Sequence, residues 1–355
     1  MGKTYRVVGV GFDHMHIGDE LATAMEHPLT DVVGVLDRSE DRPRAVLADL
    51  HLDVPVATEL DRLLEAEPDI AFVCSTTAEH EQWVERLAAA GVHIILEKPM
   101  ADSLEAADRM VAAAERAGVV LAVNWPQAWI ASHRTAKRVA AEGTIGRIEQ
   151  VHYYGGNRGP LYHSHGKIEL TPTTADKAES WWYSRAAGGG SLRDYFGYAA
   201  TLGTWYRDGE MPWGVTAAAW GAEGLEVDEQ AVVIGHYDSG LSVSQTRWGT
   251  FTDPWTQQPQ PSCGFVLNGT EGSISSWDYD TTVTVHTADG IATVPVDQPA
   301  PEDRTALANL VAHLRDGRPL DPPLTAGMSR AGHAIVEAAI RSVETHALVR
   351  LAGQR

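Results

Sequence analysis

Cysteine is scarce in this chain, which carries only Cys74 and Cys263. Cys74 ends an apolar, strand-like run and is expected to be buried, so a disulfide framework is not predicted. No Cys and His residues have the spacing of a metal-binding motif, and we therefore expect no bound metal.

Positive charge is also in short supply. Lys and Arg number 28 against 48 Asp and Glu, which gives a formal net charge of -20. Such a surface repels phosphate backbones and anionic lipid, so neither a nucleic acid nor a membrane is expected as a partner. No apolar run is long enough to cross a bilayer, and we expect a cytoplasmic protein. An anionic ligand would need its own cluster of basic residues.

The remaining composition is that of an ordinary globular protein. Hydrophobic residues make up 44% and charged residues 21% of the 355 residues. A chain of this length is expected to form two domains, each with a core of its own.

Short apolar runs alternate with amphipathic stretches over the first third of the chain. This alternation predicts a parallel sheet covered by helices on both faces, and hence an N-terminal Rossmann domain over residues 1–123. The predicted strands are 5–10, 31–36, 70–74, 92–96 and 119–123, and the predicted helices are 16–26, 41–50, 79–90 and 103–117.

The pattern changes near Asn124. After one more helix over 130–142, period-2 runs joined by turn sequences predict an open, mostly antiparallel sheet in a C-terminal α/β domain, residues 124–355. The predicted strands are 148–154, 215–220, 230–236, 241–248, 264–268, 273–277, 282–287 and 291–296. Two helices over 301–316 and 326–348 end the chain, with the option that they pack back on the first domain. Residues 157–187 have no periodicity, and a loop of that length is often functional.

A Gly-x-Gly turn follows the first predicted strand. Gly9 and Gly11 allow a dinucleotide diphosphate to approach bare backbone at a helix N-terminus. Asp37 ends the second strand, where a carboxylate accepts hydrogen bonds from the adenosine ribose and repels the extra phosphate of NADP. Arg38 and Arg42 follow and would welcome that phosphate, so NAD is preferred and NADP stays open.

The third glycine position of this fingerprint holds a histidine, His14. A side chain there must point away from the diphosphate or displace it. We interpret His14 and His16 as groups at the helix start or in solvent rather than as ligands.

Several segments together resemble the glucose–fructose oxidoreductase, inositol dehydrogenase and rhizopine-catabolism (Gfo/Idh/MocA) oxidoreductase family. The resemblance covers nearly the whole chain, and four pieces in order carry it. They are 73–80 (VCSTTAEH), 91–99 (GVHIILEKP), 188–194 (GGGSLRD) and 269–273 (GTEGS), with a matching C-terminal stretch from Leu324 to Ser342.

The resemblance implies the catalytic residues. The family lysine falls on Lys98 and the active-site aspartate on Asp194. Tyr198 stands four residues later, where many members have His, and Phe196 replaces the usual glycine. The implied cofactor-binding residues are Gly9, Gly11, Phe12, Asp13, His14, Asp37, Arg38, Ser75, Thr76, His80, Glu97 and Lys98.

Oxidation of an alcohol requires a base for the hydroxyl proton while hydride leaves the carbon. A tyrosine is a weak base at neutral pH, but an ammonium beside it favours the phenolate. Lys98 near Tyr198 would do this, and Asp194 would bind a second hydroxyl and hold the lysine charged. The alternatives are structural: a loop lysine, an Asp that caps a helix and a core tyrosine.

Substrate contacts are expected from the end of the last Rossmann strand and from the aperiodic region. Polar groups and flat rings suit a sugar, and the basic cluster would suit a sugar acid or phosphate. A solvent loop or a subunit interface remains the alternative for these residues. They are Asn124, Trp125, Arg158, His163, His165, Lys167, Trp182 and Arg185, together with Asp194 and Tyr198, with Arg247 and Trp248 as lesser candidates.

The sequence therefore predicts an NAD-dependent oxidoreductase acting on a secondary hydroxyl of a sugar, inositol or glycoside. One alternative is a glycoside hydrolase that oxidises, eliminates, hydrates and reduces with the same residues. A second is a non-catalytic NAD-binding regulator, against which the presence of both Lys98 and Asp194 argues. The resemblance also implies a homodimer or homotetramer.

Overall fold

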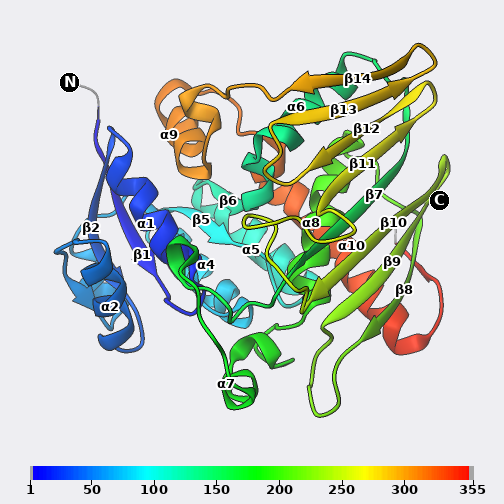
Figure 1. Cartoon of the computed structure of the whole chain (residues 1–355). Coiled ribbons are helices and arrows are strands. Elements are labelled where there is room, and N and C mark those ends of the chain that lie inside the picture. The colour runs from blue at the N-terminus through cyan, green and yellow to red at the C-terminus, as the bar shows by residue number, and fades with distance from the viewer. Residues whose placement is uncertain (1–2, 352–355) are drawn as a thin grey trace. The chain divides into compact units, whose positions relative to one another are not determined.

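The computed structural model describes residues 3–351, which fold as two compact units (Figure 1). The first unit comprises the chain up to Asn124 together with His163–Thr171 and Pro301–Gly327. The second comprises Trp125–Tyr162, Pro172–Ala300 and the chain from Met328 onward. The two inserted segments of the first unit thus come from the part of the sequence that was assigned to the second domain.

A six-stranded parallel sheet forms the centre of the first unit. Its strand order is β3-β2-β1-β4-β5-β6, the order typical of dinucleotide-binding domains. Every strand pair is parallel, and the central strands are buried on both faces. The strands are β1 (Tyr5–Val10), β2 (Thr30–Leu36), β3 (Val56–Ala57), β4 (Ile70–Val73), β5 (His93–Glu97) and β6 (Leu121–Asn124).

Helices connect these strands, as a parallel sheet requires. Ser103 caps α5 by accepting a hydrogen bond from the Ala106 N–H, and Gly118 ends that helix with a φ of 68°. The predicted limits of α1 agree with the structure, and those of α5 differ only by its cap residue. The helices are α1 (His16–Glu26), α2 (Asp41–Asp49), α3 (Leu60–Leu64), α4 (His80–Ala89), α5 (Leu104–Ala117) and, near the end of the chain, α9 (Ala306–Asp316).

The second unit is built on a nine-stranded sheet of order β14-β13-β12-β11-β7-β10-β9-β8-β15. All pairs among the described strands are antiparallel except β7 with β10. The strands are β7 (Ile148–Asn157), β8 (Gly214–Trp220), β9 (Gln230–Tyr237), β10 (Gly240–Trp248), β11 (Gly264–Gly269), β12 (Gly272–Trp277), β13 (Thr282–Thr287), β14 (Gly290–Pro295) and β15 (Val349–Arg350). The predicted fold class, a Rossmann domain with an open-sheet α/β domain, is confirmed.

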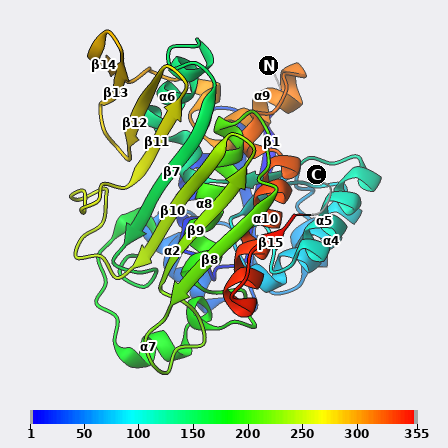
Figure 2. The same ribbon diagram turned by 90° about the vertical axis from the view of Figure 1, so that its right-hand side faces the viewer.

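One face of this sheet carries helices. α8 (Ser191–Tyr206) packs on β7, β9 and β10, and α6 (Ala131–Ala141) packs on β12 and β13. α10 (Ala326–Thr345) lies against α8, where a Cβ at Gly332 would meet Thr201. The opposite face, turned toward the viewer in Figure 2, is covered by no helix of the second unit within residues 3–351. The short α7 (Thr174–Glu179) belongs to the aperiodic region.

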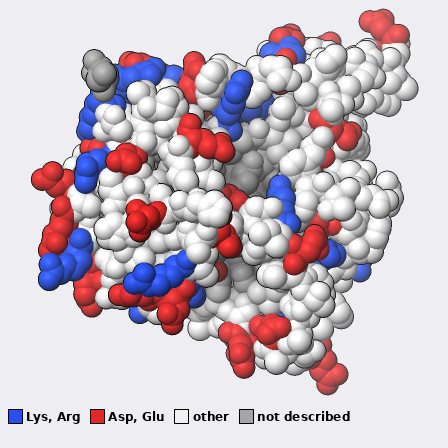
Figure 3. Space-filling model, turned by 60° about the vertical axis from the view of Figure 1, so that its left-hand side comes forward, with Lys and Arg blue, Asp and Glu red and all other residues white. Residues whose placement is uncertain are grey.

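No helix among the described residues is both long and apolar enough to cross a membrane. On the face drawn in Figure 3, the Lys and Arg side chains lie among Asp and Glu side chains and form no continuous basic surface of described residues.

Candidate functional site

The turn after β1 has the close backbone packing that a nucleotide loop needs. Gly11 has a φ of 78°, and a Cβ there would lie 2.6 Å from the Ser75 nitrogen. The Gly11 N–H donates to the Leu36 carbonyl, and the His14 N–H donates to the Cys74 carbonyl. The loop is thereby tied to the ends of β2 and β4, and only glycine fits at position 11 without strain.

Asp37 lies buried at the end of β2, where the sequence predicted a ribose-binding carboxylate. Its Oδ1 accepts a hydrogen bond of 3.4 Å from the Phe12 N–H. The Arg42 guanidinium donates two hydrogen bonds, of 2.9 Å and 2.7 Å, to the same carboxylate and a third, of 2.7 Å, to Asp13. Arg38 donates to Asp13 as well. The predicted residues Phe12, Asp13, Asp37 and Arg38 are thus brought together.

Arg42 is the member of this network that the sequence analysis weighed only as a phosphate-binding alternative. Its bidentate contact with Asp37 neutralises the carboxylate and fixes its orientation. The sequence signal for this contact was the five-residue spacing between Asp37 and Arg42 across the start of α2.

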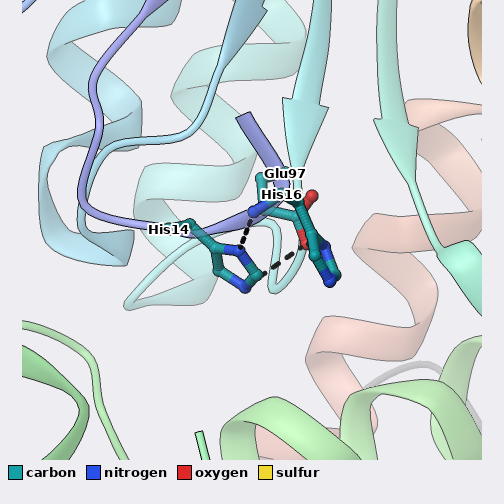
Figure 4. Close-up of side chains that lie close together, drawn as sticks. All are labelled: His14, His16 and Glu97. Carbon is teal, nitrogen blue, oxygen red and sulfur yellow. Dashed lines mark hydrogen bonds and ion pairs between the residues drawn. The ribbon is translucent and has the colours of Figure 1, made fainter. Parts of the chain in front are cut away.

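Glu97, at the end of β5, is the centre of a buried cluster (Figure 4). Its Oε1 lies 3.1 Å from His16 Nδ1, 3.6 Å from His14 Nε2 and 3.9 Å from Lys98 Nζ. Lys98 Nζ is also 3.4 Å from His14 Nε2. Glu97 Oε2 is buried and has no hydrogen-bond partner within residues 3–351. An acceptor left in this state is available to a hydroxyl of a bound ligand.

His14 lies at the start of α1, one of the two places predicted for it, and it is buried rather than in solvent. His14 is 1% exposed, and burial lowers its pKa well below the ordinary value, with smaller contributions from His16 and Lys98. The side chain points toward Glu97, with Nε2 3.6 Å from Glu97 Oε1 (Figure 4). His16 is half-buried.

His14, His16 and Glu97 offer ligand atoms of the kinds that transition metals bind, and these atoms lie within 4.8 Å of one another. His14 Nδ1 accepts a hydrogen bond from the His16 N–H, which leaves the ring proton of neutral His14 on Nε2. A cation on Nε2 would have to displace that proton and would lie beside the Lys98 ammonium. The arrangement therefore fits a hydrogen-bonded cluster around Glu97 better than a metal centre.

Ser75, Thr76 and His80 lie just beyond β4. All three are buried, and His80 Nδ1 is 3.2 Å from the Met100 carbonyl. That contact places the ring proton on Nδ1 and leaves Nε2 as an acceptor, which has no partner among the described residues. Burial lowers the pKa of His80.

Asn124 ends β6, as predicted, but its amide is occupied. Its Nδ2 donates to the Glu20 carboxyl on α1. Burial, followed by the charge of Glu97, raises the pKa of Glu20 to about 8. Sequence reasoning missed Glu20, because a Glu on an amphipathic helix is ordinarily on the exposed side.

The structure places three predicted substrate residues, His163, His165 and Lys167, in the first unit. The His165–Lys167 turn packs on α1. The predicted residues Arg158, Trp182 and Arg185 belong to the second unit.

Asp194 and Tyr198 lie one turn apart on α8, both buried in the second unit. Trp248 Nε1 donates to Asp194 Oδ2 at 3.2 Å. The Trp125 ring stands edge-on to Tyr198 with centroids 5.3 Å apart, and its Nε1 donates to Ser329. Asp194 belongs to the first turn of α8 and is not its cap, which is Gly190.

The start of α8 is held by Asp228, which the sequence analysis did not single out. Its Oδ2 accepts hydrogen bonds of 2.7 Å from the Ser191 hydroxyl and the Leu192 N–H. Asp228 thereby supplies from a distant loop the cap that Gly190 cannot provide.

Further aromatic rings of the second unit surround this helix start. Trp182 is stacked on Trp181 at 4.0 Å and meets Trp248 edge-on at 6.2 Å, while Tyr183 lies 5.5 Å from Trp248. Trp182, Trp248 and Asp194 therefore form one group. Tyr183 was not identified from the sequence.

The two predicted arginines of the second unit have acidic partners. Arg158 binds the buried Asp253 through its backbone N–H and its guanidinium. Arg185 is exposed and contacts Glu226 and Glu344. The predicted substrate roles of Arg158 and Arg185 stay predictions.

Comparison with known proteins agrees with this description. The family model described as "Oxidoreductase family, NAD-binding Rossmann fold" matches residues 3–125, and the "GFO/IDH/MocA C-terminal domain" model matches residues 133–275. The 1,5-anhydro-D-fructose reductase of Ensifer adhaerens is 29% identical over 78% of this chain and 79% of its own length. The D-apiose dehydrogenase of Paraburkholderia graminis is 30% identical over 39% of this chain and 36% of its own length.

Solved structures share the fold over the whole chain. An oxidoreductase from Agrobacterium radiobacter, solved with NAD+, L-tartaric acid and magnesium, superposes with a TM-score of 0.79 at 17% identity and covers 99% of this chain and 100% of that one. Because the identity is low, this likeness supports the fold alone.

Proposed function

Because this chain belongs to the GFO/IDH/MocA family of NAD-binding oxidoreductases, we propose that it transfers hydride between NAD and a secondary hydroxyl of a sugar-like substrate. The observation that carries the proposal is Lys98, an ammonium that is 4% exposed and lies beside Glu97 at the carboxyl edge of the nucleotide-binding sheet. Buried charges are rare unless function retains them. The curated relatives named above act on sugars or anhydro-sugars, according to their names.

The residues of the first unit fit a dinucleotide. Gly11 leaves a cradle that a Cβ would fill, and Glu97 Oε2 is a buried acceptor without a partner among the described residues. The nicotinamide would supply the hydride acceptor or donor. Asp37 would receive the adenosine ribose hydroxyls, and we propose NAD as the preferred form because this carboxylate repels an added phosphate. Arg42, already paired with Asp37, limits that repulsion.

We propose that Lys98 and Tyr198 act on the reacting hydroxyl group and that Asp194 acts on a neighbouring one. Tyr198 Oη or Lys98 Nζ would take the hydroxyl proton, and the positive charge of Lys98 would favour the deprotonated phenol or alkoxide. Asp194, held by Trp248 Nε1, would accept a hydrogen bond from a neighbouring hydroxyl. This division gives Lys98 an electrostatic role and Asp194 an orienting role.

A sugar is the substrate class that best suits the aromatic group of the second unit. Trp182 and Trp248 are buried rings close to Asp194, and flat rings suit the C–H side of a pyranose while a carboxylate suits its hydroxyls. Arg158 would add a donor to a carboxylate or hydroxyl of the substrate.

We also propose that the chain forms a homodimer or homotetramer through the uncovered face of its large sheet. Trp220, Val232 and Leu241 are large apolar residues that are 57%, 43% and 45% exposed on adjacent strands of this face. Exposed apolar groups of this kind commonly mark interfaces. Light scattering of the wild type and of Trp220→Lys tests this: the variant should have the lower mass, and equal masses would exclude this face.

The proposed activity is tested by a screen that follows NADH absorbance across sugars, inositols, sugar acids and aryl glycosides, with aglycone release scored in parallel. Stoichiometric NADH supports the dehydrogenase, and aglycone without net NADH supports the hydrolase alternative. Lys98→Met should lower kcat about a thousandfold, a typical loss for an acid–base group. Lys3→Ala removes an exposed lysine paired with Asp69 and should leave kcat unchanged. Equal rates for wild type and Lys98→Met would overturn the proposal.

A further inference from the structure

The segment His163–Thr171, called here the strap, belongs to the nucleotide-binding unit although its sequence neighbours on both sides belong to the other. Sequence analysis predicted that its basic residues contact the substrate. Their position in the structure argues instead for a role at the cofactor, an inference that rests on the proposed function because it concerns the same dinucleotide.

The strap is a closed loop with a defined shape. His163 and Glu169 form an antiparallel bridge, and the Ser164 N–H donates to the Ile168 carbonyl at 2.8 Å. Gly166 and Lys167 follow one another with φ of 63° and 59°, which turns the chain sharply. A non-glycine residue with this φ is uncommon, so the local contacts must hold the tip in place.

The tip of the strap is fixed to the beginning of α1. The Gly166 N–H donates to Asp19 Oδ1 at 2.6 Å. A Cβ at Gly18 would lie 2.6 Å from His165 Cβ, so the strap packs directly on the bare backbone of the helix. His165 Nε2 also lies 3.3 Å from Asp49 Oδ2 at the end of α2.

This part of α1 is one turn from the helix N-terminus, where a dinucleotide diphosphate binds in a Rossmann domain. The Asp19 carboxylate would repel that diphosphate if it were left alone. The strap offsets its charge, since Gly166 donates to it and the Lys167 ammonium is attracted by it. Burial lowers the pKa of Lys167, and the Asp19 charge opposes that effect.

We propose that the strap is a cofactor clamp: Lys167 and the tip around His165 and Gly166 hold the dinucleotide diphosphate at the start of α1 and do not bind the sugar. The clamp has to lift from Gly18 and Asp19 for the dinucleotide to enter or leave. Strap contacts therefore set the affinity and the residence time of the cofactor.

The test measures dinucleotide binding directly, by NADH fluorescence and by calorimetry with ADP-ribose, which has the diphosphate but no nicotinamide. Lys167→Ala should weaken both ligands about tenfold, the loss expected for one charge-assisted contact. The KM for the sugar at saturating NAD should stay within about twofold of wild type. Lys177→Ala, ten residues away and paired with Glu229 in the second unit, is the matched control.

A second variant acts on the strap without changing any of its residues. Gly18→Ala introduces the Cβ that collides with His165, and alanine favours helix more than glycine, so α1 should persist. It should speed NADH dissociation in stopped flow and expose the peptide bond after Lys167 to trypsin in the presence of NADH.

The outcomes separate this inference from the proposed function. A wild type that binds no dinucleotide would overturn the proposed function itself. If the wild type binds NADH and both Lys167→Ala and Gly18→Ala bind it equally well, the clamp is overturned while the proposed function stands. A higher KM for the sugar in these variants, with unchanged affinity for NADH, would show that the strap contacts the substrate and would also contradict the clamp.

Discussion

Replacement of Glu20 by Gln examines the buried carboxyl that holds Asn124 at the end of β6. Glu20 is 9% exposed, and its pKa is raised to about 8, first by burial and then by the charge of Glu97. Gln has nearly the same shape and keeps the carbonyl oxygen that accepts from Asn124 Nδ2. The change therefore removes the ionisation and little else.

The sign of the effect follows from proton binding. Below a pH of about 4.5, Glu20 is protonated in both the folded and the unfolded chain and costs nothing. Between that value and about 8 the folded chain keeps the proton while the unfolded chain loses it, so the free energy of unfolding falls as the pH rises. Each pH unit costs about 1.4 kcal/mol, which amounts to about 3 kcal/mol at pH 7.

The assay is urea unfolding of wild type and Glu20→Gln at a series of pH values from 4 to 9. The variant should match the wild type at the acid end and become more stable by about 3 kcal/mol near neutrality. Glu26→Gln, an exposed change on the same helix, should follow the wild type throughout. Parallel pH profiles for wild type and Glu20→Gln would refute the assignment of a raised pKa to this carboxyl.

Three further variants test other parts of the account. Gly11→Ala places a Cβ against Ser75 at a positive φ and should weaken NADH binding at least tenfold by fluorescence titration, and unchanged binding would refute the assignment of this loop to the diphosphate. Asp37→Ser should lower the affinity for NADH about tenfold and reduce the ratio of NADH affinity to NADPH affinity. An increase in that ratio would show that Asp37 does not exclude the extra phosphate of NADPH. Trp248→Phe removes the hydrogen-bond donor to Asp194 and should lower kcat/KM tenfold or more while the affinity for NADH is retained. A wild-type kcat/KM in this variant would show that Trp248 has no role in catalysis.

Most elements of the first 124 residues were predictable because their local signals agree with one another, although β3 and α3 were not predicted. β1 and α1 were predicted at the limits that the structure shows, since an apolar run, a glycine turn and an amphipathic helix follow in order. α8 was not predicted as a helix. Nearly all of its residues are buried, so its sequence has no polar face and no 3.6-residue periodicity to read.

The candidate site was predictable in its residue types but not in its partners. His14 and His16 are neighbours in the sequence, yet the Glu97 that they meet comes from β5, and only the parallel sheet order brings these strand ends to one edge. The strap residues were assigned by their position between two segments of the second domain. The strap is held on α1 by the hydrogen bond from the Gly166 N–H to Asp19 and by packing on Gly18, which has no side chain. No sequence pattern indicates either contact.

Direct transfer of hydrogen from the substrate carbon to NAD is the central claim. The measurement that tests it most directly is incubation of wild-type protein and NAD+ with the sugar found in the screen, deuterated at the reacting carbon, followed by mass spectrometry of the nicotinamide. We expect NADH that carries one deuterium, formed by wild type and lost with Lys98→Met. Deuterium released to water, or unlabelled NADH, would contradict the account.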